Sequence, residues 1–212
     1  MYSVVDLCKY RETDGGTEII INVPNHRLGN MLSRKMIRKA ELRLGDGRTI
    51  SAEQRKKAYA TIADIADYTG YLPEEQKEWL KFLHRAYTGC EYFSLSNCTM
   101  DTAREFINTI LEYAIENGIP LSDEAINRTD DIGRCLYYCI MNKKCAICGR
   151  QGEIHHEDAI GMGNDRRKYD DANNKKICLC REHHTIAHQM GVDRFRQMYK
   201  VYGITIKEDE HG

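Results

Sequence analysis

The spacing of apolar and polar residues predicts a chain of mixed strands and helices. Residues 2–10 and 17–23 are rich in β-branched side chains, and the segment between them, 11–16, ends in two glycines. This pattern predicts a hairpin with a glycine turn. A third strand is expected at residues 40–44, before the turn residues 45–47.

Helical spacing dominates the next hundred residues. Four segments have it: 51–70, 73–89, 100–118 and about 122–144. Ser51 and Gln54 fit a capping box, Gly70 fits a helix stop, and Pro73 suits a first helical turn. Residues 91–97 fit either a short strand or a loop. The expected fold class is therefore α+β, with a domain boundary near residues 120–143.

Composition narrows the class of protein. The chain has 212 residues, of which 42% are hydrophobic and 30% charged, so it can bury a core and stay soluble. It contains no apolar run of the roughly 18 to 20 residues that span a bilayer, and its start lacks the apolar core of a signal peptide. We therefore expect a cytoplasmic protein without a membrane partner.

The net charge of −1 conceals a basic segment. Residues 24–60 hold ten Lys and Arg against three acids. The basic residues considered for binding phosphates are Arg34, Lys35, Arg38, Lys39, Arg43, Arg48, Arg55, Lys56 and Lys57. Tyr59 or Tyr68 could stack on bases beside them. The alternative is an ordinary solvated face.

Four of the nine cysteines suggest a metal site. An odd number of cysteines without a secretion signal argues against a disulfide framework. Cys135 and Cys139 lie four apart in an apolar stretch, which favours packing inside a helix. Cys145, Cys148, Cys178 and Cys180 instead lie close to several histidines.

A structural zinc is predicted from the spacing of these thiols. Cys145 and Cys148 form a C-x-x-C pair followed by a glycine, as in a zinc knuckle, and need two further ligands. Cys180 and His183 repeat the two-residue gap, so we assign the zinc to Cys145, Cys148, Cys180 and His183. Cys178 stays an alternative ligand, although a packed core thiol suits it better.

The remaining histidines suggest a second ion. His184 and His188 lie four apart in a predicted helix, so both imidazoles leave one face. A lone histidine on a helix is usually structural, but the adjacent pair His155 and His156 adds to these two. Because successive strand residues point to opposite sides, one of that pair can bind a metal while the other activates water. This division of labour is typical of a metal-dependent phosphodiesterase.

Residues 143–190 resemble the HNH endonuclease family, whose zinc-stapled members have the ββα-metal fold. The resemblance rests on the C-x-x-C pair, the His-His dyad and the H-x-x-x-H helix, the last two of which also resemble colicin nuclease domains. It implies His155, His184 and His188 as ligands of a catalytic ion and His156 as the general base. Mg2+ or Mn2+ is the expected catalytic ion, and three histidines would also suit Zn2+ or Ni2+.

Two features of the connecting segment complete this hypothesis. The family's central asparagine corresponds best to Asn174, with Asn173 as the alternative. The long loop before it carries Arg166, Arg167 and Lys168, which we expect to hold the DNA backbone. The alternative is a solvent loop with ordinary charges. Glu157 and Asp158 are expected to be loop or supporting carboxylates rather than ligands.

The N-terminal part, about residues 40–125, resembles the lambdoid phage recombination protein NinB. The segments "RTISAEQRKKAYATIADIADYTGY" and "LSNCTMDTAREFINTILEYAIENGIPLSDEA" carry this resemblance. It implies a small α+β domain that binds single-stranded DNA and takes part in homologous recombination, which we place at 1–125. A connecting helix is expected at 126–142 and the HNH domain at 143–205. A homodimer and a single-strand-binding protein are partners to be tested.

Three functions follow from these patterns. The leading hypothesis is an HNH endonuclease that acts on single-stranded or branched DNA in phage-type recombination or replication, in the cytoplasm of a bacterial host. The second is a non-catalytic single-stranded-DNA-binding mediator with a zinc module. The third is a zinc-built protein interaction module, which a spare histidine dyad disfavours.

Overall fold

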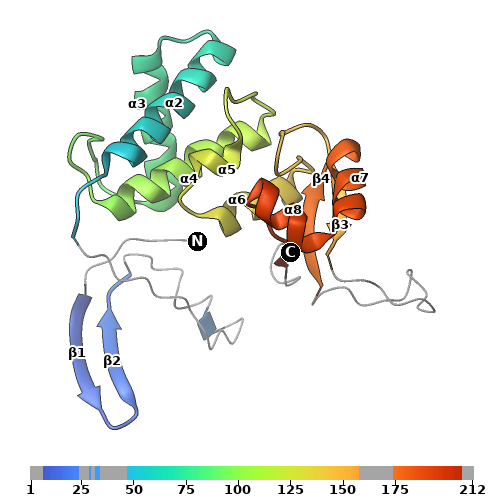
Figure 1. Ribbon diagram of the computed structural model, residues 1–212. Coiled ribbons are helices and arrows are strands. Elements are labelled where there is room, and N and C mark those ends of the chain that lie inside the picture. Colours follow the sequence, from blue (N-terminus) through green and yellow to red (C-terminus); the bar gives the residue numbers. More distant parts are fainter. Residues whose placement is uncertain (1–6, 24–28, 30–31, 34–46, 158–173, 207–212) are drawn as a thin grey trace.

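The computed structural model describes residues 7–23, 29, 32–33, 47–157 and 174–206 (Figure 1). The described elements are β1 (Leu7–Thr13), β2 (Gly16–Ile21), α2 (Ala52–Thr69), α3 (Pro73–Thr88), α4 (Met100–Glu116), α5 (Ala125–Arg128), α6 (Ile132–Met141), β3 (Glu153–His156), β4 (Lys175–Leu179), α7 (Arg181–Met190), α8 (Val192–Tyr199) and β5 (Ile204–Thr205). β1 and β2 form one antiparallel sheet and β3, β4 and β5 another, in that order. The α+β class is confirmed. Among these described helices, none combines the length and apolar character needed to cross a membrane.

The predicted N-terminal hairpin is confirmed. β1 and β2 pair from Leu7 opposite Ile21 to Thr13 opposite Gly16, and Gly16 takes a positive φ of 130° at the turn. In Figure 1 the hairpin extends away from the helices. The strand predicted at residues 40–44 lies outside the described residues.

α2 begins and ends where its sequence predicts. The side chain of Ser51 accepts the N–H of Gln54, and the side chain of Gln54 accepts the N–H of Ser51, which completes the capping box. Gly70 ends the helix with a left-handed φ of 78°, a conformation that glycine adopts without steric cost. α3 begins at Pro73 as predicted, and residues 91–97 contain a turn and no strand.

α2, α3 and α4 bury the first hydrophobic cluster. Its buried members are Ile50, Ala58, Ile62, Ile65, Leu80, Phe93, Leu95, Cys98, Ala103, Phe106, Ile107, Ile110, Leu111, Ala114 and Ile119. His84 also lies in this cluster, with its ring edge-on to Phe93 and Phe106.

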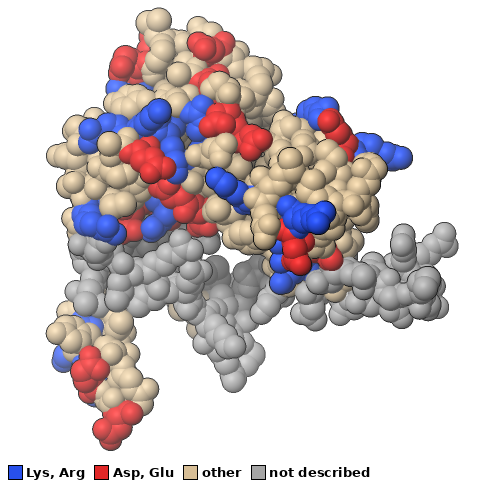
Figure 2. All heavy atoms as spheres, in the orientation of Figure 1, with Lys and Arg blue, Asp and Glu red and all other residues tan. Residues whose placement is uncertain are grey.

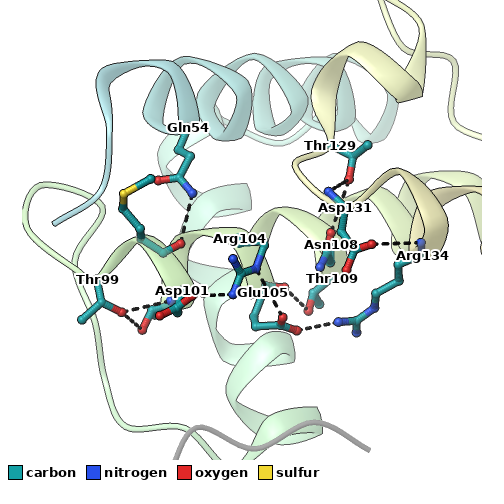
Figure 3. A network of polar contacts seen from close by, with 12 residues as sticks. Gln54, Thr99, Asp101, Arg104, Glu105, Asn108, Thr109, Thr129, Asp131 and Arg134 are labelled. Atoms are coloured by element: carbon teal, nitrogen blue, oxygen red, sulfur yellow. Dashed lines mark hydrogen bonds and ion pairs between the residues drawn. The ribbon is translucent and has the colours of Figure 1, made fainter. Parts of the chain in front are cut away.

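The single helix predicted from about residue 122 to 144 is wrong, because the chain forms α5 and α6 with a break between them. Thr129 adopts an extended conformation, and its hydroxyl accepts the N–H of Asp131 at 2.8 Å. The carboxylate of Asp131 then accepts the N–H of Arg134 as the cap of α6. These local side-chain bonds replace the helical ones at the break. Figure 3 shows how Arg134 then reaches Glu105 of α4.

A second hydrophobic cluster lies around α6 and β4. Its buried members are Ile115, Ile126, Cys135, Leu136, Tyr138, Cys139, Cys145, Ala146, Ile147, Ile177, Leu179, Cys180, Ala187, Phe195 and Val201. Burial of Cys135 and Cys139 in α6 confirms that they are packing residues. Ala125 packs against both clusters. The predicted domain limits at 125 and 143 stay predictions.

The buried His84 makes stability depend on pH. Burial, helped by the nearby charge of Arg134, lowers the pKa of His84 to about 4, and its Nδ1 lies 2.7 Å from Oγ1 of Thr109. The unfolded chain gains this proton near pH 6.5, whereas the folded chain resists it until about pH 4. The free energy of unfolding should therefore fall as the pH drops through this window, by about 3 kcal/mol for this group.

Urea denaturation of the wild type and of His84→Gln between pH 7 and 4 tests this prediction. The variant keeps a polar group for Thr109 but lacks the titration, so its stability should depend less on pH. The histidines around the metal clusters are common to both proteins and cancel in the comparison. Equal pH dependence in the two proteins would contradict the prediction.

Candidate metal centres

A tight turn, β3, β4 and α7 build the candidate site. β3 and β4 pair with His155 opposite Ile177, and α7 follows β4 directly after Cys180. The turn at residues 145–150 is closed by the N–H of Cys145, which donates to the carbonyl of Arg150 at 2.7 Å, and Gly149 takes a φ of 67°. The N–H of Ala146 donates to the carbonyl of Cys178. The turn is thus fixed to β4, close to the start of α7.

The four residues that the sequence assigns to zinc form one cluster. One ligand atom from each of Cys145, Cys148, Cys180 and His183 lies within 4.8 Å of the others. The Sγ atoms of Cys148 and Cys180 are 3.7 Å apart, and Nδ1 of His183 lies 3.5 Å from Sγ of Cys145 and 3.2 Å from Sγ of Cys180. Zn–S bonds of about 2.3 Å in a tetrahedron place two sulfurs about 3.8 Å apart. We call these four residues the Cys3His cluster.

Cys178 is not a member of the Cys3His cluster. It is fully buried in β4, and burial raises the pKa of its thiol to about 12. A side chain at Gly152 would meet its sulfur at 2.8 Å, so it is packed against the start of β3. The geometry therefore favours a packed core thiol at Cys178.

Three histidines form a second cluster. Ligand nitrogens of His155, His184 and His188 lie within 4.8 Å of one another. The ring centroid of His155 is 4.7 Å from that of His184 and 4.8 Å from that of His188, and the last two are 4.9 Å apart. β3 contributes the first ring and successive turns of α7 the others. We call these residues the three-imidazole cluster.

The environment of the two clusters suits metal ions. Burial, followed by repulsion from His184 and His188, lowers the pKa of His155 to about 4, so the ring is neutral near pH 7. Burial likewise raises the pKa of the Cys145 thiol to about 12, so a thiolate there needs a cation beside it. Thiolates with one imidazole match Zn2+, whereas neutral imidazoles match several divalent transition metals.

The sequence did not point to Glu153, which orients one imidazole. Nδ1 of His184 lies 2.6 Å from Oε1 of Glu153. A carboxylate can only accept, so His184 donates its Nδ1 hydrogen and keeps Nε2 for a metal. Glu153 precedes His155 by two residues, so both belong to one face of β3. That spacing is the signal that sequence reasoning could have used.

Replacing Glu153 by glutamine should weaken metal binding at the three-imidazole cluster by about tenfold. Loss of such an outer carboxylate typically costs 10–100-fold in affinity, because the ligand imidazole loses its fixed orientation and some basicity. Titration calorimetry with Mn2+ or Zn2+ measures the change. Glu74→Gln, at an exposed carboxylate that pairs with Lys77 of α3 instead, is the control. Equal affinity in Glu153→Gln and the wild type would refute the role of Glu153.

His156 lies next to the three-imidazole cluster but outside it. It ends β3, opposite Lys176, and is half-buried. The next residue, Glu157, is held away from any ligand role because its carboxylate accepts two hydrogen bonds from Arg196 of α8, at 2.6 and 3.3 Å. Its backbone N–H donates to the carbonyl of Lys175. The chain is thus anchored at Glu157, directly after His156.

Asn174 is the other residue predicted for catalysis that the structure describes. It immediately precedes β4 and is half-buried. Its Nδ2 atom is buried and has no hydrogen-bond partner within the described residues. Asn173 and Asp158 lie outside the described residues, as do the predicted DNA-binding residues Arg34, Lys35, Arg38, Arg166, Arg167 and Lys168.

Comparison with known proteins agrees with this arrangement. Residues 22–211 match a family model described as "Putative HNHc nuclease". No curated protein and no solved structure matches the chain. The match extends over nearly the whole chain and includes both metal clusters, so the chain belongs to this HNH nuclease family.

Proposed function

We propose that this protein is a metal-dependent HNH endonuclease that hydrolyses phosphodiester bonds in DNA. The observation that carries the proposal is the convergence of His155, His184 and His188 beside a separate His156. The family match supports nuclease chemistry. A purely structural zinc module would use the Cys3His cluster and have no need of a second group of histidines.

The residues of the site have distinct roles in this proposal. His155, His184 and His188 would hold Mg2+ or Mn2+, with Zn2+ or Ni2+ also suited to three imidazoles. The bound ion supplies positive charge for the phosphate and the leaving oxygen. His156 accepts a proton from the attacking water, whose oxygen bonds to phosphorus as the bond to the 3′ oxygen breaks. The products carry a 5′ phosphate and a 3′ hydroxyl, and Asn174 would brace the segment that carries the base, His156.

The Cys3His cluster is assigned a structural Zn2+. Cys145 and Cys180 belong to the second hydrophobic cluster, and His183 packs edge-on against Tyr199 of α8. The ion therefore joins the turn, α7 and the C-terminal helix. It contributes to folding rather than to the reaction.

DNA is the proposed substrate, and single-stranded or branched DNA in recombination is the more specific proposal. Tyr59 and Tyr68 of α2 are exposed, which suits stacking on bases. Two basic residues of the same helix are already engaged, since Arg55 donates to the carbonyls of Leu95 and Ser96 and Lys57 pairs with Asp130. On the face shown in Figure 2, basic and acidic side chains are intermixed. The proposed phosphate contacts therefore rest on residues 34–38 and 166–168.

A cleavage assay tests the function directly. Circular single-stranded, supercoiled and branched DNA are incubated with the purified protein and Mg2+, Mn2+, Zn2+, Ni2+ or EDTA. Nicking or linearisation with one of these ions, and none with EDTA, is the expected result. DNA binding without cleavage under every ion would reject the nuclease and favour the non-catalytic single-strand-binding mediator.

A further inference from the structure

One ligand of the Cys3His cluster is exposed, and a single arginine contacts it. Cys145 and Cys180 are buried and His183 is half-buried, whereas Cys148 is exposed. Nε of Arg150 donates to Sγ of Cys148 at 3.2 Å, and Nη2 lies 3.7 Å from Sγ of Cys180. The guanidinium therefore contacts two sulfurs at once, on the exposed side of the cluster.

A carboxylate on the opposite element fixes this guanidinium. Nη2 of Arg150 donates to Oε2 of Glu182 at 2.6 Å, from the turn to the first turn of α7. Both side chains are more than half exposed. An isolated surface pair of this kind contributes little to stability. The pair instead holds the guanidinium of Arg150 in contact with the sulfurs of Cys148 and Cys180.

The charges of the cluster explain what the arginine can do. Three thiolates, a neutral imidazole and Zn2+ carry a net charge of −1. The guanidinium balances that charge, and its donors, fixed in one plane, engage two sulfurs and a carboxylate in a geometry that the flexible point charge of a lysine holds less rigidly. A hydrogen bond to a thiolate draws electron density from the sulfur, so the thiolate attacks electrophiles more slowly.

We propose that Arg150, oriented by Glu182, protects the Cys3His cluster by donating a hydrogen bond to Cys148 and lowering the reactivity of its thiolate. This inference rests on the structural zinc assigned under the proposed function. Arg150 is a positioning residue for the cluster and takes no part in DNA cleavage. Without it, Cys148 becomes the point at which electrophiles or chelators open the site.

Two measurements on the full-length, zinc-loaded protein test the proposal. The first follows iodoacetamide labelling of Cys148 by peptide mass spectrometry; the sulfur bonds to the reagent's carbon as iodide leaves. The second follows zinc transfer to a coloured chelator. Arg150→Ala should accelerate both by about tenfold, the lower end of the effect of supporting residues around metals. Arg150→Lys and Glu182→Gln should lie between this variant and the wild type.

Arg181→Ala is the matched control. Arg181 is also exposed and lies next to Cys180, but in the described part of the chain its side chain donates no hydrogen bond to a cysteine. Its labelling and zinc transfer should match the wild type. Wild-type rates in Arg150→Ala, or acceleration in Arg181→Ala equal to that in Arg150→Ala, would overturn the proposal.

Neither readout depends on DNA cleavage, so the outcome is separable from the nuclease proposal. If the purified wild-type protein contains no zinc, both the zinc assignment and this inference are overturned. The cleavage assay would still decide whether the protein is a nuclease. Normal zinc content with unchanged labelling would overturn the role of Arg150 alone.

Discussion

Replacing His156 by alanine should reduce DNA cleavage by at least about 100-fold without reducing metal affinity. General-base catalysis typically contributes 10²–10⁴-fold to a rate. His156 lies outside the three-imidazole cluster, so its removal leaves all three proposed ligands in place. Single-turnover cleavage measures the first effect, and calorimetric titration with the activating ion measures the second.

A ligand variant provides the contrast. His188→Ala should lose metal affinity, and part of its activity should return at high metal concentration. His156→Ala should not recover under the same conditions, because added metal does not replace a proton acceptor. Recovery of His156→Ala by added metal would assign His156 a ligand role and refute its role as the base.

Both metal clusters could be predicted from the sequence because their members come in short, regular spacings. The C-x-x-C pair, the gap from Cys180 to His183 and the four-residue step from His184 to His188 each determine a local geometry. The structure brings these residues together as the spacings predict. The spacings do not show which pair far along the chain completes each site. The chemistry of the side chains limited that choice, because only a few cysteines and histidines could serve as ligands.

Contacts that depend on strand register or on a turn were not predictable in the same way. Glu153 reaches His184 across 31 positions of the chain, and Arg196 reaches Glu157 across 39. The two-residue step from Glu153 to His155 indicates a shared strand face, but it does not identify His184 as the partner. The contacts of Arg150 were also not predictable from spacing, because its partners lie both in its own turn, at Cys148, and at the start of α7, at Cys180 and Glu182.

The break between α5 and α6 was missed for a local reason. Apolar spacing continues through it, since Ile126 before the break and Leu136 after it both enter the second hydrophobic cluster. The signal was Thr129 and Asp131, whose side chains bond to the backbone two and three residues ahead. Thr and Asp favour caps and turns over helix interiors, and a prediction based only on the spacing of apolar residues does not take this preference into account.

Removing the zinc proposed for the Cys3His cluster should unfold the second hydrophobic cluster. Structural zinc in small modules contributes an apparent 10–16 kcal/mol, as much as the whole stability of a typical domain. Cys145 is almost fully buried, so Cys145→Ser or treatment with a strong chelator should expose the amides of β4 and α7. Hydrogen exchange read by mass spectrometry measures this loss of protection. The single tryptophan, Trp79 in α3 against Tyr113, reports separately on the helices of the first cluster, and its fluorescence should change little.

Cys178→Ser separates zinc loss from disturbance of the core. Cys178 is as buried as Cys145 and lies in the same region, but it is not part of the Cys3His cluster. The Cys178→Ser variant should keep one zinc and strong protection of the α7 amides against hydrogen exchange. Its free energy of unfolding should fall by only about 1–3 kcal/mol, because the new hydroxyl is buried. Zinc loss in Cys178→Ser together with zinc retention in Cys180→Ser would transfer the fourth ligand to Cys178. Because Cys180 directly precedes α7, such a result would leave His183, among the proposed ligands, as the sole tie between the zinc and the helix that carries His184 and His188.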